Sequence, residues 1–448
     1  MTGPRNDAST PSGLRRLWKE VRVSPVEVVV LMLLVYGGAL GMLWHLRQWG
    51  WVEFGFYGIH HEPVAGFLTL ILVYLLTLPL VYLCPDRHLT GLLLLQGAGF
   101  TLLVFSPVMA AALFGAAVMC FTTCTLIRRF WVKAVVLTAI LLLPAAGLIF
   151  RGEGAKASFP LFGLAFAMMA GFKVFLFAFE THTRRRGYRE LPRFLVYLFL
   201  APNLVIPPYH VVIPGYGAFW KSLRRTHKAD VALHGLSRLG WALLDAGLLV
   251  VVGTQHEVLL RLAGNAWLVA LHLRFLELYL GVATAAHMVV ALANGLGFDL
   301  RPAMRMPYLS RGFLEFLNRF VPYFKDWMAT LFYYPLVMHL RKKMRAVPLQ
   351  FLAIVNALVV GNTAAHLLRY VYSLDQPEHR ARLFEVSYEN ILFSGAIALY
   401  FVVWKPYEAC RDRLVARGWK WLDPAAGVLE RCVTVTLFAW LFFFSLGA

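Results

Sequence analysis

Long apolar runs recur along almost the whole chain and are separated by short polar or basic connections. An α-helix rises about 1.5 Å per residue, so roughly 20 apolar residues are needed to cross the hydrocarbon core of a bilayer. The runs predict about eleven transmembrane helices, at about 25–44, 64–83, 88–105, 107–126, 130–150, 160–180, 239–253, 267–294, 349–372, 388–404 and 429–447. The expected fold class is therefore an all-α polytopic membrane protein.

Basic residues indicate how these helices are oriented. Residues 1–23 form a polar, basic segment, and Arg128, Arg129 and the cluster at 184–189 fall on the same side of the membrane as that segment. Lys and Arg concentrate in the cytoplasmic loops of membrane proteins. We therefore expect a cytoplasmic tail over 1–23, a single membrane domain over 24–448, a cytoplasmic N-terminus and an extracytoplasmic C-terminus.

Two segments do not fit a simple crossing. The segment near 194–208 is short and ends in Pro207 and Pro208, and the segment near 322–340 has basic flanks that both favour the cytoplasmic side. Broken, partly polar segments are tolerated at membrane depth only where protein or a water-filled cavity surrounds them. Both segments are predicted to be re-entrant.

A short amphipathic helix is expected just before the second of these segments. Phe313, Phe316, Leu317 and Phe320 recur at helical spacing, and polar residues lie between them. This pattern predicts a helix that lies along the cytoplasmic surface of the membrane.

Composition supports the membrane assignment. The 448 residues are 59% hydrophobic and only 15% charged, with a mean hydropathy of +0.64, which excludes an ordinary soluble protein. The formal net charge is +19, but the basic residues cluster in loops between apolar runs, so membrane lipids rather than nucleic acid are the expected electrostatic partner. The five cysteines have no metal-ligand spacing, and no metal site is expected.

One stretch, residues 296–336, combines Pro, Arg and aromatic residues in an arrangement that resembles a known family. Its first part matches the pattern GF-x-L followed by P-Y-L-S, at Gly297, Phe298, Leu300, Pro307, Tyr308, Leu309 and Ser310. Its second part matches a longer aromatic and basic pattern at Phe316, Arg319, Trp327, Tyr333, Pro335 and Leu336. The late histidine of the same pattern corresponds to His366, at the end of an apolar run. These residues resemble the membrane-bound O-acyltransferase (MBOAT) family, particularly its bacterial members that acetylate alginate or esterify teichoic acids.

The chain also departs from the family pattern. The first histidine of the family aligns with Val321, its Arg-Asp pair with Ala329 and Thr330, and the Trp before its late histidine with Ala365. A valine can act neither as a base nor as a hydrogen-bond partner. The resemblance therefore argues more strongly for the fold than for the chemistry.

The resemblance implies a catalytic role for His366 as the general base that takes a proton from an attacking hydroxyl. Asn362 and Asn318 are the nearest polar candidates to orient this histidine or to polarise the acyl carbonyl. Lys325, Arg319 and Trp327 are candidates for binding the acyl donor, and Lys325 with Asp326 alternatively forms the solvated end of a helix. The implied donor is acyl-CoA or another cytoplasmic acyl thioester, used as a substrate, and no permanently bound cofactor is expected.

The same resemblance implies a bacterial cytoplasmic membrane, a hydroxyl-bearing glycan or lipid as acceptor, and a possible acyl-shuttling partner protein. Two other functions remain open. The chain is alternatively a catalytically degenerate protein of this architecture that binds or moves lipid, or an unrelated transporter with broken helices.

Structural roles are the default for the remaining polar residues of the apolar runs. His366 is alternatively a core histidine bonded to Asn362, one turn earlier. Arg274 and Glu277 are expected to satisfy each other. Lys173 and Glu180 share one predicted span, Asp245 lies alone in another, and His287 lies in the inner half of its own.

Overall fold

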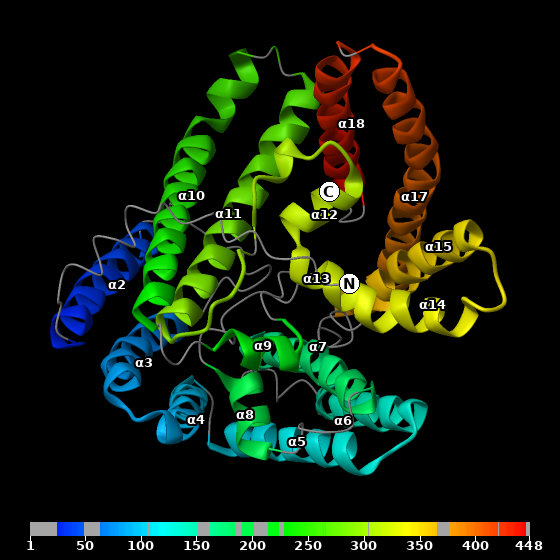
Figure 1. Ribbon diagram of the computed structural model, residues 1–448. Helices are drawn as coiled ribbons and strands as arrows, with labels where there is room; N and C mark the ends of the chain where they lie inside the picture. Colours follow the sequence, from blue (N-terminus) through cyan, green and yellow to red (C-terminus); the bar gives the residue numbers. More distant parts are fainter. Residues whose placement is uncertain are drawn as a thin grey trace.

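The fold of the chain is helical throughout the part that the structure describes (Figure 1). This computed structural model describes residues 25–48, 63–104, 107–150, 161–183, 190–200, 214–223, 228–262, 264, 266–302, 304–364, 377–419 and 421–444. Within these ranges there is no β-strand, and Leu223 and Phe298 form an isolated antiparallel bridge. The all-α prediction is confirmed for the described residues.

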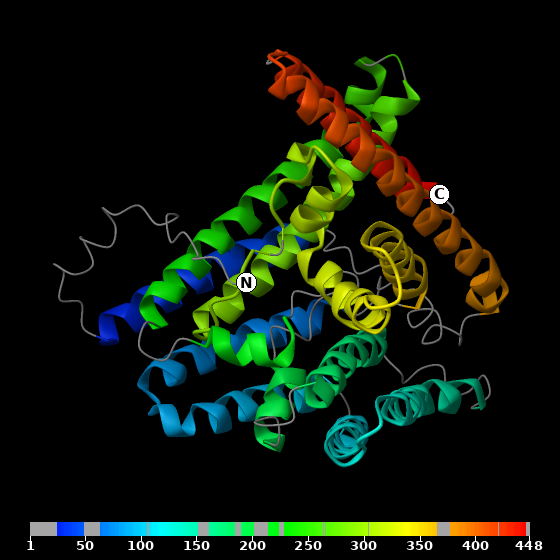
Figure 2. The ribbon, with the colours of Figure 1, turned by 45° about the vertical axis from the view of Figure 1, so that its right-hand side comes forward.

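The first half of the chain forms a series of apolar helices that follow the predicted runs closely. They are α2 (Pro25–Gln48), α3 (Pro63–Leu83), α4 (Asp86–Val104), α5 (Pro107–Leu126), α6 (Phe130–Phe150) and α7 (Leu161–Thr183). Three of them begin at a proline, which suits the first turn of a helix because proline has no N–H to leave unpaired there. Helices α3 to α6 make up the lower layer of the molecule in Figures 1 and 2.

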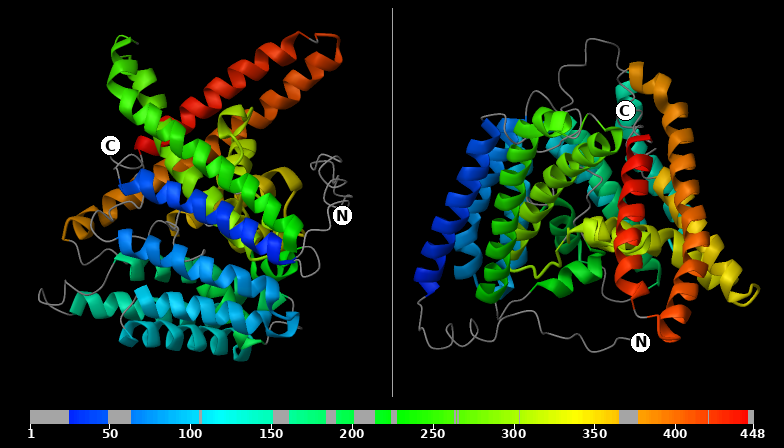
Figure 3. Two further views of the ribbon diagram at one scale, coloured as in Figure 1. Left: turned by 90° about the vertical axis from the view of Figure 1, so that its left-hand side faces the viewer. Right: turned by 90° about the horizontal axis from the view of Figure 1, so that it is seen from above.

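The second half contains longer helices joined by a central, broken segment. Its elements are α8 (Leu191–Phe199), α9 (Tyr216–Ser222), α10 (Lys228–Leu262), α11 (Trp267–Gly295), η4 (Pro307–Leu309), α12 (Phe313–Phe320), α13 (Pro322–Met328), η5 (Ala329–Tyr333), α14 (Tyr334–Leu340), α15 (Ala346–Val355), η6 (Asn356–Gly361), α17 (Pro377–Ala416) and α18 (Leu422–Phe444). Seen from above, α12 lies between the α10–α11 pair and the α17–α18 pair (Figure 3).

Three described helices are long and apolar enough to cross a membrane, by length and composition: Asp230–Leu262, Trp267–Gly295 and Ala346–Ala364. Large apolar side chains are also exposed on helix surfaces, for example Leu34, Leu76 and Leu95. Exposed apolar surface of this extent is typical of a protein that contacts lipid or a partner. The count of about eleven spans stays a prediction, as do the re-entrant segments and the sidedness of the termini.

The predicted segments that break the pattern are only partly described. Residues 194–200 are helical up to Phe199, and residues 201–208 lie outside the described part, as does the tail at 1–23. Residues 322–340 form one helical stretch through α13, η5 and α14.

The helix predicted over residues 313–320 is confirmed, but its apolar face packs against protein. Phe316 and Phe320 of α12 contact Phe275 of α11 and Phe438 of α18, with ring centroids 4.2–6.3 Å apart. All four residues are buried. This aromatic cluster joins the two long helix pairs around α12.

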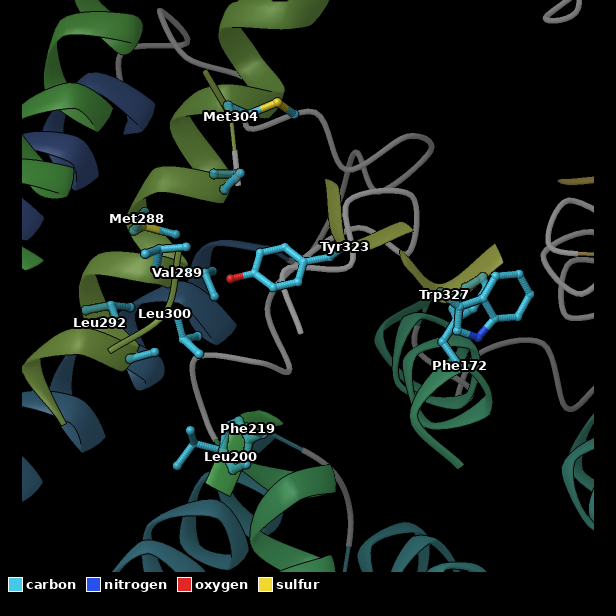
Figure 4. Packing of buried hydrophobic residues seen from close by; sticks show 14 of the residues in the cluster. Phe172, Leu200, Phe219, Met288, Val289, Leu292, Leu300, Met304, Tyr323 and Trp327 are labelled. Carbon is cyan, nitrogen blue, oxygen red and sulfur yellow. The ribbon is translucent and has the colours of Figure 1, made fainter. Parts of the chain in front are cut away.

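The C-terminal half of α11 is buried on all sides and forms the middle of the core. Figure 4 shows Met288, Val289 and Leu292 of α11 close to Leu300 and to the ring of Tyr323. The Tyr323 hydroxyl donates a hydrogen bond to the Arg301 carbonyl at 2.8 Å. This bond ties the broken segment after α11 to α13.

Close helix packing around α11 depends on two glycines. A Cβ atom on Gly235 of α10 would lie 2.1 Å from the Tyr36 hydroxyl, and one on Gly295 would lie 2.0 Å from the Tyr74 hydroxyl. Because these positions have no side chain, the Tyr36 hydroxyl reaches the carbonyls of Ala232 and Ala291, at 3.2 and 3.1 Å. Tyr36 thereby joins α2 to both α10 and α11.

The α17–α18 hairpin is fastened by an ion pair at its polar end. Arg411, beyond the predicted span of α17, contacts Glu430 of α18, whose side chain is almost fully buried. Burial lowers the pKa of Arg411, but its hydrogen bonds to Asp412 and Glu430 outweigh burial and raise that pKa above its ordinary value. The guanidinium therefore stays charged and keeps the hairpin closed.

Two charged residues of α7 satisfy the ends of the neighbouring short helices. Lys173 is buried, and its Nζ donates hydrogen bonds to the carbonyls of Tyr197 and Leu198, at 2.8 and 3.0 Å, where α8 ends. Glu180 accepts a hydrogen bond from the backbone N–H of Gly217, at 2.8 Å, in the first turn of α9. The donor supplies partners for carbonyls at a helix C-terminus, and the acceptor supplies one for an N–H at a helix N-terminus, groups that a helix leaves unpaired at its ends.

We predict that Lys173→Met lowers the apparent melting temperature of the detergent-solubilised protein. Methionine has a similar length but no donor, so two buried carbonyls lose their hydrogen bonds, at about 1–3 kcal/mol for each unsatisfied group. Lys221→Met, at an exposed lysine of α9, is the matched control and is expected to melt like the parent. Equal melting of the two variants would contradict the capping role of Lys173.

Candidate functional site

The predicted catalytic histidine, His366, lies outside the described residues, as does Ala365. The structure does describe the helical segment that leads to it, from α15 through η6 to Ala364. The surroundings of this segment therefore carry the structural information on the predicted site.

The segment that leads to His366 packs against the second part of the family-like stretch. The Asn356 side chain of η6 donates a hydrogen bond from Nδ2 to the Phe332 carbonyl of η5, at 2.8 Å. A Cβ atom on Gly361 would lie 2.9 Å from the Phe332 ring, so this ring rests directly against the glycine backbone. Residues 329–333 and 356–361 are both π-helical, a conformation that is rare and often occurs at functional sites.

The predicted donor-binding residue Trp327 lies inside this interface. Its ring contacts Phe172 of α7, Phe324 and Phe332, with centroids 4.6–5.8 Å apart, and Figure 4 shows it beside Phe172. The Trp327 side chain is buried, and its indole N–H has no hydrogen-bond partner. Trp327 therefore has the environment of a core residue with one unused donor.

The predicted orienting residue Asn362 follows η6 directly. Its side chain is buried and donates a hydrogen bond from Nδ2 to the Ser394 hydroxyl of α17, at 3.2 Å. Thr363, the next residue, has a buried hydroxyl without a hydrogen-bond partner. The last described turn before His366 is thus held by α17 and carries an unused polar atom.

The other three predicted residues lie at the surface of the central segment. The Lys325 side chain donates a hydrogen bond to Asn318 Oδ1, at 2.5 Å, and lies 3.1 Å from Asp326. Arg319 is bonded to Glu315 at 2.8 Å and also reaches the Arg305 carbonyl. The structure therefore brings Asn318 together with Lys325, and it brings Trp327 together with the η6–Asn362 segment through Phe332.

Val321, which aligns with the first histidine of the family, lies at the junction of α12 and α13. It is half-buried and packs against the apolar core. A valine at this junction offers no polar atom to a substrate, and Asn318, one turn earlier, is exposed and engaged by Lys325.

Polar residues of two predicted spans pair across helices, and the expectation that Arg274 and Glu277 satisfy each other was wrong. Asp245, alone within its own predicted span, has its Oδ2 3.7 Å from Nε2 of His287 on the facing helix. Glu277 does not pair with Arg274: it accepts a hydrogen bond from His256 of α10, at 2.7 Å. Both pairs lie between α10 and α11, and opposite positions of an antiparallel helix hairpin were the sequence signal that could have revealed them.

Among the residues that the structure describes, no group of three or more His, Cys, Asp or Glu side chains is arranged to hold a metal ion. A scan against models of protein families finds none that matches this chain, and a search of curated proteins finds no match either. The resemblance to the acyltransferase family therefore rests on the residues that carry it.

We predict that Gly361→Ala disturbs the η5–η6 interface. The added methyl group would overlap the Phe332 ring, and overpacking of this kind destabilises a protein by about 1–3 kcal/mol. Gly395→Ala on α17 is the control, because a Cβ there meets no atom within 4 Å. A lower apparent melting temperature for the first variant alone is expected, and two unchanged variants would argue against this close packing.

Proposed function

We propose that the protein is a membrane-embedded O-acyltransferase that moves an acyl group from a cytoplasmic thioester to a hydroxyl of a lipid-borne or extracytoplasmic acceptor. The observation that carries the proposal is the packing of η5 against η6. The family-like pattern has two parts far apart in sequence, around Trp327 and at His366. The Asn356–Phe332 hydrogen bond and the Phe332–Gly361 contact join the segments that carry these two parts.

The chemistry assigned to His366 is that of a general base. Its imidazole accepts the proton of the acceptor hydroxyl as that oxygen attacks the thioester carbonyl. The new ester C–O bond forms, the C–S bond breaks, and the proton returns from the imidazolium to the leaving thiolate. A protein interior that excludes water protects the thioester from hydrolysis during this transfer.

Asn362 is proposed to act beside this base. It precedes His366 by one helical turn, so their side chains share a helix face. Its bond to Ser394 uses one amide N–H, and the amide retains a second N–H and its carbonyl oxygen for a neighbour. The same fixed geometry also suits a purely structural cap.

The donor end of the site is proposed to lie at the exposed polar group around Lys325. Lys325 and Arg319 present cations beside Asn318, and the phosphates of CoA prefer such donors. Acidic neighbours compensate both cations in the free protein, so donor binding would have to compete with Asp326 and Glu315. Trp327 lies between this polar group and the interior, where its ring contacts Phe172, Phe324 and Phe332.

A second candidate function is that of a catalytically degenerate protein of the same architecture that binds or moves lipid. Val321 favours this alternative, because it replaces a polar family residue with an apolar, half-buried side chain. Substitution of His366 separates the two candidates.

We expect His366→Ala to abolish acyl transfer while the protein is still produced at the parental level. Loss of a general base lowers a rate by about 10²–10⁴-fold. Surface glycans and membrane lipids of a deletion strain complemented with each variant are compared by mass spectrometry. His339→Ala, at an exposed histidine of α14, is the control. Restoration of the full acylation profile by His366→Ala would favour the non-catalytic alternative.

We further expect Lys325→Met to weaken the binding of CoA to the purified protein by roughly tenfold, which corresponds to the loss of one hydrogen bond to a charged group. Binding is measured by titration calorimetry with free CoA as the probe. Lys343→Met, at an exposed lysine after α14, is expected to bind like the parent. Identical affinities of the parent and Lys325→Met would remove Lys325 from the donor site.

A further inference from the structure

The interface between α10 and α11 contains two pairs of histidine and carboxylate side chains. These helices run antiparallel on either side of a turn at Gly264 and lie side by side along their length (Figures 1 and 3). His256 of α10 faces Glu277 of α11, whereas Asp245 of α10 faces His287 of α11. The two pairs are about three helical turns apart on the same interface.

The pair nearer the turn is directly hydrogen-bonded. Nδ1 of His256 and Oε1 of Glu277 are 2.7 Å apart, and the two side chains are 20% and 27% exposed. The Glu277 carboxylate and the His256 imidazole thus bond directly to each other, and both side chains are partly exposed. This pair therefore provides an internal reference for the deeper one.

The deeper pair is not satisfied by the protein. Nε2 of His287 and Oδ2 of Asp245 are 3.7 Å apart, beyond the usual hydrogen-bond range of about 2.7–3.2 Å. The side chains are only 5% and 8% exposed. Asp245 Oδ2 and His287 Nδ1 are both buried without a hydrogen-bond partner. A buried polar atom left unpaired costs about 1–3 kcal/mol, so this arrangement indicates a ligand that the side chains themselves do not supply.

We propose that Asp245 and His287 form an intramembrane proton-binding site, in which one proton is shared between the carboxylate and the imidazole through a bridging water molecule. With one proton the pair is neutral overall, either as a carboxylate with an imidazolium or as a carboxylic acid with a neutral imidazole. In the exchange between these forms the N–H bond of His287 breaks and the O–H bond of Asp245 forms, with the water relaying the proton.

The chemistry of the pair selects a proton over other small ligands. A carboxylate repels anions, and the described residues offer no third His, Cys, Asp or Glu beside the pair to hold a metal ion. A water molecule between Nε2 of His287 and Oδ2 of Asp245 can hydrogen-bond to both of these facing atoms. The 3.7 Å separation is too long for a direct bond. Ionisable residues of this kind in membrane spans are typical of proton relays.

Other polar groups face the pair from the surrounding elements. Arg238 lies on α10 within electrostatic reach of His287, and Tyr279 of α11 lies within reach of Asp245. The Tyr308 ring of η4 lies 6.0 Å from that of Tyr279, and its buried hydroxyl has no hydrogen-bond partner. Tyr36 of α2 donates to the Ala291 carbonyl, one turn beyond His287. Arg238 opposes a second positive charge, which favours the singly protonated pair.

The proposal is tested on the full-length protein in lipid nanodiscs, with histidine rings labelled with ¹⁵N. The spectrum of His287→Gln identifies the His287 resonance. Asp245→Asn is expected to lower the proton affinity of His287 by about tenfold or more, the effect of removing an opposite charge at this distance. Glu277→Gln is the matched control: it removes the carboxylate of the other pair and should leave the titration of His287 unchanged.

A second measurement needs no variant to fold. Infrared spectra of the parent protein with ¹³C-labelled aspartate carboxyl groups, recorded as pH is changed, are expected to contain a buried carboxylic acid band that shifts on exchange into D₂O. An identical His287 titration in the parent and Asp245→Asn would overturn the proposal. Absence of any buried aspartic acid band that responds to pH would overturn it as well. The site does not depend on acyl transfer, so either result leaves the proposed function unaffected.

Discussion

The structure depends on the need to satisfy backbone polar groups in an apolar environment. A continuous helix satisfies its own groups, but every helix end leaves N–H and C=O groups that water cannot reach inside a membrane. This chain breaks its helices near the centre of the molecule, between α8 and α9 and again after α11. Lys173 and Glu180 provide the missing partners at the first break. At the second break Asn294 Oδ1 accepts a hydrogen bond from the Leu300 N–H, at 3.1 Å, and Tyr323 donates to the Arg301 carbonyl.

Close approach of the helices provides further contacts between them. Gly235 and Gly295 allow the Tyr36 and Tyr74 hydroxyls to reach the α10 and α11 backbones, and Gly361 allows the Phe332 ring to rest on η6. Lipid provides no hydrophobic driving force between helices, so packing of small residues and hydrogen bonds across helices hold them together. The same arrangement of small and aromatic residues positions the segment that leads to His366.

Sequence reasoning predicted where most helices lie, because an apolar run and a proline at its start are local signals. The run at 160–180 became α7, and the spacing of Phe313 to Phe320 became α12. Helices α10 and α17 extend well beyond their apolar runs, since both continue as helix into polar residues. An apolar run alone does not indicate such polar extensions. The tertiary partners were not predictable in this way. The local rule that pairs residues one turn apart suggested Arg274 for Glu277, but the facing helix provided His256 instead.

In the candidate site, too, the sequence indicated residues but not their tertiary partners. The sequence pattern indicated Asn362 and Trp327, but their environments depend on the rotation of η6 and α13 about their axes, which no apolar pattern determines. Four ionisable side chains of the apolar helices fall into two groups, according to whether the protein provides them with hydrogen-bond partners. Lys173 and Glu180 are matched by backbone groups at helix ends, so their polar side chains are explained by the fold. Asp245 and His287 are buried, whereas Glu180 is only partly buried, and Asp245 Oδ2 and His287 Nδ1 have no hydrogen-bond partner. Because a folded chain tolerates few uncompensated groups of this kind, the unmatched pair points to function, whereas the matched residues point to architecture.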